Sequence, residues 1–197
     1  MTNVIGLDFD DVLVGFNDGL CVFHNAQYGT YLTREDFVCY PLEKTFGCDK
    51  AEVGPRIMAF YRSPEHAAIV PMPGAVDATR ELQKKHPVVV ITSRPQSVER
   101  ETRVLLDAHF PSLARDIHFA RHSFHGEGSE TKGQICRKLG AEVFVDDAPP
   151  LVEEVAPFVR QVLLFDAPWN RRYAPSHPNI RRVRSWGEIL AFLAETE

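Results

Sequence analysis

Residues 88–91 form an unbroken run of valine and isoleucine, and this run restricts the possible folds more than any other segment. β-Branched side chains favour strands, and a strand with no polar alternation is typical of a sheet that is covered on both faces. Such sheets are mostly parallel, because the helices that cover their faces also connect successive strands. The run therefore predicts an α/β fold built on a parallel sheet.

Short apolar segments elsewhere in the chain alternate with amphipathic ones, as a parallel sheet with crossover helices requires. The predicted strands are residues 4–7, 88–91, 117–120, 142–145 and 161–165. The predicted helices of the same unit are residues 75–85, 97–108, 131–139, 151–156 and 186–194. This order predicts a Rossmann-like core in which helices cover both faces of the sheet.

Residues 15–72 interrupt that alternation with a segment that is rich in phenylalanine and tyrosine and lacks the two-residue period of strands. Within it, Thr33 and Ser63 each precede residues that are typical of the first turn of a helix. We therefore predict several short helices that form a cap inserted after the first strand. The remaining residues, 1–14 and 73–197, are predicted to form the core.

Polar side chains follow three of the predicted strands, at the edge of the sheet where ligands collect in parallel α/β proteins. These residues are Asp8, Asp10, Thr92, Ser93, Asp146 and Asp147. Lys132 lies in the first turn of the predicted helix after the third strand, near the same edge. Carboxylates this close repel one another unless a cation or a shared proton relieves them, and a hard, oxygen-liganded ion such as Mg²⁺ suits them. The sequence thus predicts one crevice that holds carboxylates, hydroxyl groups and a lysine; ordinary solvated strand ends are the alternative.

The spacing of these residues resembles that of the haloacid dehalogenase superfamily of phosphohydrolases. Residues 8–12 resemble its first motif and Thr92 its second. Lys132 resembles its third motif, and residues 146–147 resemble its fourth. The segment inserted after the first motif is similar to the small helical cap of that superfamily. The resemblance implies a hydrolase of phosphoric monoesters.

For the reaction, the resemblance implies that Asp8 attacks phosphorus and forms an aspartyl-phosphate, which divides hydrolysis into two easier steps. Asp10 would protonate the leaving oxygen and then take a proton from water. Mg²⁺, held by Asp8, the backbone carbonyl of Asp10 and Asp146, would neutralise charge on the phosphoryl oxygens. Lys132 would balance the charge that develops there.

The same resemblance gives supporting roles to the other polar residues of the crevice. Thr92 and Ser93 would hydrogen-bond a phosphoryl oxygen. Asp147 would orient Lys132 or a metal-bound water. Arg94 follows the hydroxyl pair and has two open interpretations. It binds phosphate or another anionic group of the substrate, or it pairs with an acidic residue of a helix.

A narrower resemblance concerns the substrate. Four segments are similar to the cytosolic 5′(3′)-deoxyribonucleotidase group: residues 71–75, 91–93, 169–171 and 185–190. That group packs aromatic side chains of the cap against the base, whereas this chain has Gly19 followed by Leu20 at the corresponding place. Leucine has no π face, which predicts weak base selectivity unless a nearby aromatic residue compensates. The candidates for this compensation are Phe16, Phe23, Phe37 and Tyr40.

The resemblance therefore implies a nucleoside monophosphate as the substrate. One alternative is a phosphatase for another small phosphorylated metabolite, such as a sugar phosphate. A different class of alternative is a catalytically silent binding or regulatory protein on the same fold. The presence of every motif residue argues against that silent protein.

The overall charge and composition exclude several other classes of protein. The formal net charge is −5, which gives no electrostatic basis for binding nucleic acid or an anionic membrane. No apolar run approaches membrane-spanning length. Four cysteines without a Cys-x-x-Cys spacing predict reduced thiols in a cytoplasmic protein. The expected partner is a small phosphorylated substrate, and a homodimer is left open.

Two further groups of residues have both a structural and a functional interpretation. His118, His122 and His125 could hold a structural metal, but they lack cysteine or acidic ligands at zinc-site spacing, and loop histidines above the site are the alternative. Several arginines make the last quarter of the chain locally basic: Arg160, Arg171, Arg172, Arg181, Arg182 and Arg184. We interpret them as a solvated face.

Overall fold

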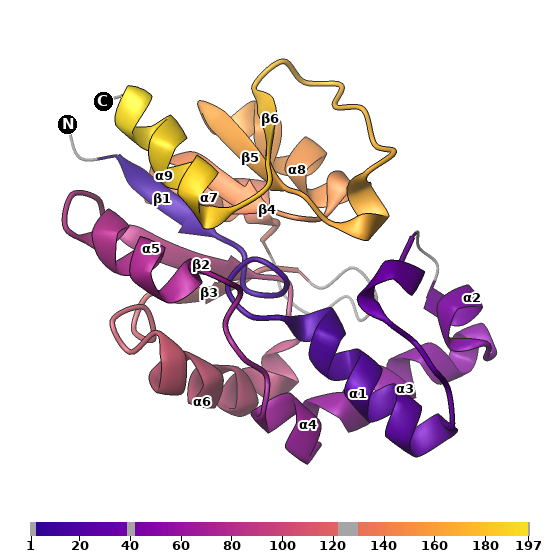
Figure 1. Cartoon of the computed structure of the whole chain (residues 1–197). Coiled ribbons are helices and arrows are strands. Elements are labelled where there is room, and N and C mark those ends of the chain that lie inside the picture. Colours follow the sequence, from indigo (N-terminus) through magenta and orange to yellow (C-terminus); the bar gives the residue numbers. More distant parts are fainter. Residues whose placement is uncertain (1–2, 39–41, 122–129, 197) are drawn as a thin grey trace.

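The structure is a computed structural model that describes residues 3–38, 42–121 and 130–196. It contains a six-stranded sheet in the order β3-β2-β1-β4-β5-β6, in which neighbouring strands are parallel (Figure 1). The strands are β1 Val4–Leu7, β2 Val88–Thr92, β3 Ile117–Phe119, β4 Ala141–Asp146, β5 Gln161–Phe165 and β6 Ile180–Val183. The predicted α/β fold with a Rossmann-like parallel sheet is confirmed.

Helices cover both faces of the sheet because its side chains alternate between two apolar clusters. One cluster contains Ile5, Leu7 and Val90, and helices α5, α6 and α9 pack on it. The other contains Ile91 and Phe144, and helices α7 and α8 pack on it. These helices are α5 Ala75–Gln83, α6 Glu99–His109, α7 Lys132–Leu139, α8 Pro149–Val155 and α9 Trp186–Glu195. Three short 3₁₀ turns accompany them: η2 Gln96–Val98, η3 Ala156–Phe158 and η4 Pro168–Asn170.

The strand order reverses between β1 and β4. The chain runs outward from β1 through β2 to β3, and in the other direction from β4 through β5 to β6. In open parallel sheets a ligand crevice forms beyond the carboxyl ends of the strands at such a reversal. The residues that follow β1, β2 and β4 therefore meet at one edge, which is the edge where the sequence places its polar residues.

Strand β6 has no counterpart among the predicted strands. Only Ile180 and Val183 are buried in it, with two arginines between them, so it lacks the apolar run of a central strand. Its position explains this composition, because edge strands commonly carry charged side chains. The interpretation of the arginines as a solvated face is wrong for Arg182, which donates to Asp166 Oδ1 at 2.7 Å and to Asn170 Oδ1 at 2.5 Å.

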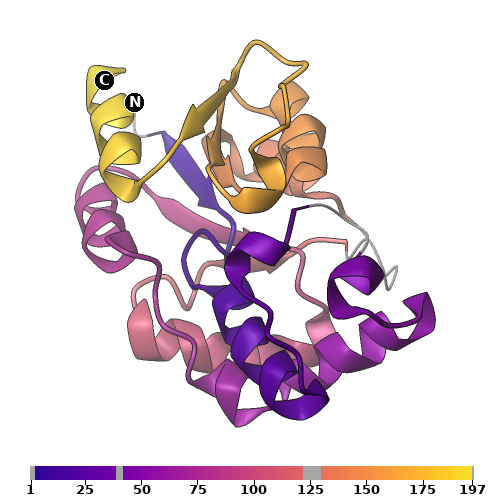
Figure 2. The ribbon, with the colours of Figure 1, turned by 45° about the vertical axis from the view of Figure 1, so that its right-hand side comes forward.

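The residues between β1 and α5 fold into helices that lie together on one side of the sheet (Figures 1 and 2). They are α1 Phe16–Tyr28, η1 Arg34–Asp36, α2 Leu42–Phe46, α3 Lys50–Tyr61 and α4 Pro64–Ala67. Both predicted helix starts are present: Thr33 N donates to Asp36 Oδ2 at 2.7 Å, and Ser63 Oγ accepts from His66 N at 3.1 Å. In the part of the chain that the structure describes, no helix is both long and apolar enough to cross a membrane.

Two hydrogen bonds join the entry and the exit of this helical segment. Met72 N donates to Leu13 O at 2.8 Å, and Gly15 N donates to Val70 O at 3.0 Å. Buried aromatic residues fill the segment and continue the apolar cluster of the sheet: Phe23, Phe37, Phe46 and Phe60. The division of the chain into a core and a cap of residues 15–72 stays a prediction.

Candidate active site

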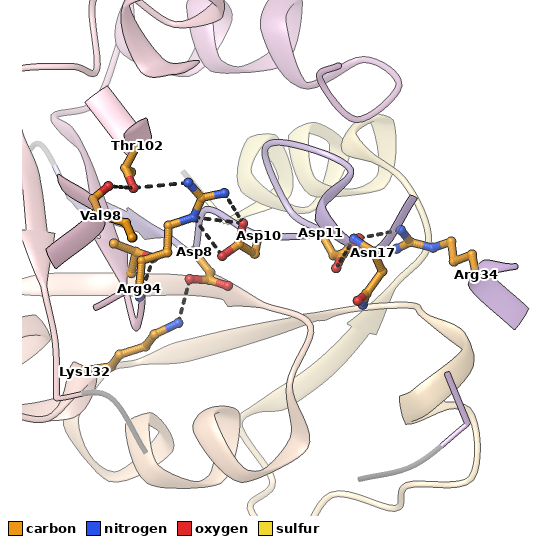
Figure 3. A network of polar contacts seen from close by, with 10 residues as sticks. Asp8, Asp10, Asp11, Asn17, Arg34, Arg94, Val98, Thr102 and Lys132 are labelled. Carbon is orange, nitrogen blue, oxygen red and sulfur yellow. Dashed lines mark hydrogen bonds and ion pairs between the residues drawn. The ribbon is translucent and has the colours of Figure 1, made fainter. Parts of the chain in front are cut away.

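A lysine and two aspartates form the centre of the crevice. Lys132 Nζ donates to Asp8 Oδ1 and to Asp146 Oδ2, at 2.7 Å in each case, and all three residues are buried. Figure 3 shows the contact between Lys132 and Asp8. Asp8 follows β1 and Asp146 ends β4, so the pairing of two adjacent parallel strands sets their separation. The structure thus brings together three of the predicted site residues.

The start of α7 places Lys132 beside these carboxylates. Thr131 N donates to Gln134 Oε1 at 2.9 Å and Thr131 Oγ1 accepts from Gln134 N at 3.3 Å, a capping box that starts the helix at Lys132. Gly133 allows α7 to pack closely on η3, since a Cβ at this position would lie 2.4 Å from the ring of Phe158. The capping box and the close packing of Gly133 on Phe158 therefore fix the position of Lys132.

Burial makes the charges of this centre depend on one another. Burial raises the pKa of the Asp8 carboxyl to about 7, while Lys132 lowers it and Asp146 raises it further. Burial also opposes the charged form of Lys132, but Asp146 and Asp8 outweigh this effect and raise the pKa of the lysine. Burial and the neighbouring Asp146 raise the pKa of Asp147 well above its usual range. The lysine therefore stays protonated, but it neutralises the carboxylates only in part.

Three carboxylates of the site lie close enough to share a cation. One oxygen of each of Asp8, Asp146 and Asp147 lies within 4.8 Å of the others. Trp169 holds Asp147 there, since its Nε1 donates to Asp147 Oδ2 at 2.7 Å. The raised pKa values of Asp8 and Asp147 and the oxygen-only donor set fit a hard divalent cation such as Mg²⁺. Asp147 thus lies in one cluster with two of the three predicted ligands, Asp8 and Asp146. Its role in orienting Lys132 or a metal-bound water stays a prediction.

Arg94 pairs with Asp10 in the crevice (Figure 3). Its Nε donates to Asp10 Oδ1 at 3.1 Å and Oδ2 at 3.0 Å, and its Nη2 donates to Oδ1 at 2.8 Å. Its Nη1 donates to Thr102 Oγ1 at 3.1 Å, and its guanidinium lies 4.5 Å from the Phe9 ring centroid. The interpretation that Arg94 pairs with a helix acid is wrong, because Asp10 lies in the loop after β1. Its role in binding phosphate stays a prediction.

The two hydroxyl residues at the end of β2, Thr92 and Ser93, have different surroundings. Thr92 Oγ1 accepts from Arg94 N at 3.1 Å. Ser93 Oγ is buried, and among the described residues it has no hydrogen-bond partner. Ser93 also lines the cavity in front of Asp8. Because a buried hydroxyl without a partner costs free energy, its position suits a group that bonds to an oxygen of a ligand.

One buried acid of the site, Asp11, has no role in the sequence-based predictions. Its φ of 56° is a left-handed conformation that is uncommon for residues other than glycine. Its Oδ1 accepts from Arg34 Nη1 at 2.5 Å, and both of its oxygens accept from Asn17 N at 3.3 Å (Figure 3). Burial raises the pKa of Asp11 to about 7, and Arg34 opposes this rise. The sequence places Asp11 directly after Asp10, but no local pattern in it predicts that Arg34 is the partner of Asp11.

A cavity of about 390 Å³ opens in front of these residues. Its polar wall contains three of the predicted acids and the lysine: Asp8, Asp10, Asp147 and Lys132. Its apolar wall contains Phe16, Leu42, Tyr61, Pro150 and Leu151. Small-molecule sites commonly enclose about 300–1,000 Å³ behind a mainly apolar lining with a few convergent polar groups. The arrangement therefore suits a small molecule that carries one anionic and one apolar part.

Residues 2–196 match the family described as 5′ nucleotidase, deoxy (pyrimidine), cytosolic type C protein. The chain belongs to this family. The resemblance to haloacid dehalogenase-type phosphohydrolases close to the nucleotidases is thereby confirmed, and the protein is a phosphoric monoester hydrolase.

One protein is similar to this hydrolase in sequence, and solved structures are similar to it in fold. A candidate nucleotidase from Oceanobacillus iheyensis is 28% identical over 120 residues, which are 60% of this chain and 58% of that protein. The match thus spans less than two thirds of that relative. A predicted phosphatase from Clostridium acetobutylicum has a TM-score of 0.68 at 14% identity, with 99% of both chains covered. A haloacid dehalogenase family hydrolase from Deinococcus radiodurans R1, with bound phosphate and sodium, has a TM-score of 0.65 at 14% identity, with 98% of this chain and 96% of that chain covered. These two structures show the shared fold alone.

The cap side chains that reach the cavity of this hydrolase differ in part from those expected. Phe16 lines the cavity, as does Tyr61, which the sequence did not single out. Leu20 is 1% exposed and packs in the apolar core, so the placement of substrate selectivity at this residue is wrong. Two other candidate aromatics are buried in the same core: Phe23 and Phe37. Tyr40 lies outside the described residues.

The remaining sequence hypotheses lie partly outside the described residues. His118 is partly buried in β3, whereas His122 and His125 fall in the stretch that the structure does not describe. The three cysteines that the structure describes are free thiols: Cys21, Cys48 and Cys136. The fourth cysteine, Cys39, lies outside the described residues.

Proposed function

We propose that this hydrolase is a Mg²⁺-dependent phosphatase for nucleoside monophosphates that acts through an aspartyl-phosphate on Asp8. The observation that carries the proposal is the buried Asp8 carboxylate, which Lys132 contacts at 2.7 Å within a group of three carboxylates. Asp8 and Lys132 also line the cavity. Buried charges are costly, so a protein without chemistry at this site would gain stability from apolar replacements. The arrangement therefore supports an enzyme over a silent binding protein.

In the proposed reaction, Asp8 attacks phosphorus, and the bond from phosphorus to the leaving oxygen breaks as the aspartyl-phosphate forms. Asp10 lies at the cavity wall and, in its protonated form, donates its proton to that oxygen and becomes a carboxylate. Asp10 then takes a proton from the water that cleaves the aspartyl-phosphate and releases phosphate. Arg94 orients the Asp10 carboxylate with its three N–H···O contacts. Lys132 donates to Asp8 and offsets negative charge near the reacting atoms.

Mg²⁺ would be held by Asp8, Asp146 and the backbone carbonyl of Asp10, with Asp147 in the same carboxylate cluster. When bound, the ion supplies positive charge that offsets the negative charge of the phosphoryl oxygens. Ser93 adds a hydroxyl donor from the end of β2, since its Oγ is buried and lies at the cavity. The Deinococcus radiodurans R1 relative, which binds phosphate and sodium, supports a site for phosphate and a cation on this fold.

The metal requirement provides the first test. We expect p-nitrophenyl phosphate to be hydrolysed with Mg²⁺ and not with EDTA. Asp146→Ala should raise the Mg²⁺ concentration for half-maximal activity by about 100-fold, and Asp147→Ala should raise it by about 10- to 100-fold and lower the rate. Glu142→Ala, at a partly exposed acid of the same strand, is the control and should behave as wild type. Activity that persists undiminished in excess EDTA would contradict the role of the ion.

The cavity lining supports a nucleotide as the substrate. Phe16 and Tyr61 place two aromatic rings 5.6 Å apart on the cap side of the cavity. Base–aromatic stacking is worth about 1–3 kcal/mol per base. The family description, which names a deoxy pyrimidine 5′-nucleotidase of cytosolic type, supports this substrate class and a cytoplasmic location.

Substrate preference can be tested at the cavity aromatics. In wild type, we expect higher kcat/KM for dUMP and dTMP than for sugar phosphates. Phe16→Leu keeps apolar volume and removes the π face, so it should lower kcat/KM for these nucleotides by about 5- to 150-fold, the equivalent of 1–3 kcal/mol. Its kcat/KM for ribose 5-phosphate should stay unchanged. Phe23→Leu, at a buried ring of the same helix outside the cavity lining, is the matched control. Equal losses for nucleotides and ribose 5-phosphate would exclude base stacking on Phe16.

A further inference from the structure

The short turn η4 holds Asp147 through both its side chain and its backbone. Trp169 Nε1 donates to Asp147 Oδ2 at 2.7 Å, and Asn170 Nδ2 donates to the backbone carbonyl of Asp147 at 2.8 Å. Asn170 is fully buried and also donates to the carbonyl of Phe165 at 2.7 Å. The indole of Trp169 therefore approaches Asp147 from a turn that is anchored to the end of β5.

Arg34 of the cap turn η1 packs on the indole ring of Trp169. The guanidinium carbon lies 4.9 Å from the ring centroid, within the range of a cation–π interaction. The same guanidinium donates to Asp11 Oδ1 at 2.5 Å and to Asp18 Oδ2 at 3.2 Å. Figure 3 shows Arg34 reaching Asp11 from a separate turn of the chain. The loop after β1 and helix α1 thus both restrict the guanidinium over Trp169.

An ion pair at the surface also joins η1 to the residue that follows η4. Arg171 Nη1 lies 2.5 Å from Glu35 Oε2, and Arg171 Nη2 lies 3.1 Å from Glu35 Oε1. Both side chains are more than half exposed, and exposed pairs contribute little to stability. Because this pair links η1 to the residue after η4 and includes none of the three clustered carboxylates, it offers a matched control.

We propose that Arg34 and Trp169 are positioning residues for Asp147. Arg34, from the cap, fixes the orientation of the Trp169 indole. The indole N–H in turn holds the Asp147 carboxylate in the cluster with Asp8 and Asp146. The position of the cap and the affinity of the core for a cation are thereby coupled, because the cap supplies the guanidinium of Arg34 and the core supplies the carboxylate of Asp147. This inference rests on the proposed function, in which that cluster holds Mg²⁺.

The experiment measures Mg²⁺ binding to the substrate-free protein by titration calorimetry, together with kcat and KM for p-nitrophenyl phosphate. Trp169→Phe keeps a ring for Arg34 and removes the N–H donor. We expect Trp169→Phe to raise the Mg²⁺ dissociation constant by about 10- to 100-fold, as loss of a group that orients a metal ligand typically does. The KM for p-nitrophenyl phosphate should change by a smaller factor. Arg34→Gln should raise that constant by a smaller factor. The double variant should match Trp169→Phe, because Arg34 acts through the indole. Arg171→Gln should bind Mg²⁺ as wild type does.

Equal Mg²⁺ affinity in Trp169→Phe and wild type would overturn the inference. Additive losses in the double variant would also overturn it, since Arg34 would then act by another route. Circular dichroism shows whether Trp169→Phe folds; if it does not, Arg34→Gln carries the test, and unchanged Mg²⁺ affinity there overturns the inference. A wild-type protein that binds no Mg²⁺ refutes the proposed function and this inference with it. A wild type that binds Mg²⁺ no better than the folded variants refutes the inference alone.

Discussion

We expect the Asp8→Asn variant to lose phosphatase activity, with kcat lowered by about 10⁴-fold or more, as nucleophile removal does in other enzymes with covalent intermediates. An amide does not attack phosphorus and is a poor ligand for Mg²⁺. The fold should persist, because the change is nearly isosteric and Lys132 keeps its 2.7 Å contact with Asp146. Burial already raises the pKa of Asp8 to about 7, so loss of this charge removes a cost of folding.

Initial rates with p-nitrophenyl phosphate, measured beside the thermal unfolding temperature of the same samples, check the Asp8→Asn result. Asp77→Asn is the matched control, since the Asp77 side chain is 90% exposed on α5 and should tolerate the change. Intact mass spectrometry excludes deamidation back to aspartate. Wild-type rates in a verified asparagine variant, purified free of contaminating phosphatase, would exclude Asp8 as the nucleophile.

The centre of the site could be predicted because a parallel sheet places the carboxyl ends of its strands at one edge. A residue directly after one of these strands then enters the crevice whatever the details of packing are, as Asp8, Ser93 and Asp147 do. Lys132 could be placed for a second local reason. Its helix starts at a capping box formed by Thr131 and Gln134, so the first turn of the helix is readable in the sequence.

Contacts that depend on packing between distant segments could not be predicted. Arg94 is visible after the hydroxyl pair, but its long side chain could reach many acids, and its actual partner Asp10 lies 84 residues away. Trp169 reaches Asp147 over 22 residues through the irregular turn η4, which has no periodic pattern. Leu20 lies four residues along α1 from Phe16, about 6 Å further along the helix axis, and enters the core instead of the cavity. Sequence spacing alone does not show where a cavity ends.

Lys132→Met should affect activity and stability together. The side chain keeps similar length and loses its charge, so two buried carboxylates lose the cation that contacts each at 2.7 Å. Removal of a preorganised positive group beside the transferred phosphoryl should lower kcat by about 10²–10³-fold. Steady-state rates at saturating Mg²⁺ measure this loss. Lys138→Met is the control, since that lysine lies on the same helix and its side chain is 68% exposed.

Stability separates this charge effect from a simple packing defect in Lys132→Met. Breaking a buried ion pair by removing one partner costs about 3–5 kcal/mol, which for a domain of this size lowers the unfolding temperature by roughly 6–20 °C. The loss should be largest in EDTA. A cation bound only by the folded state stabilises it by mass action, so saturating Mg²⁺ should raise the unfolding temperature more in the variant than in wild type. An equal Mg²⁺-dependent rise in both proteins would mean that Lys132 and the cation do not neutralise the same carboxylates.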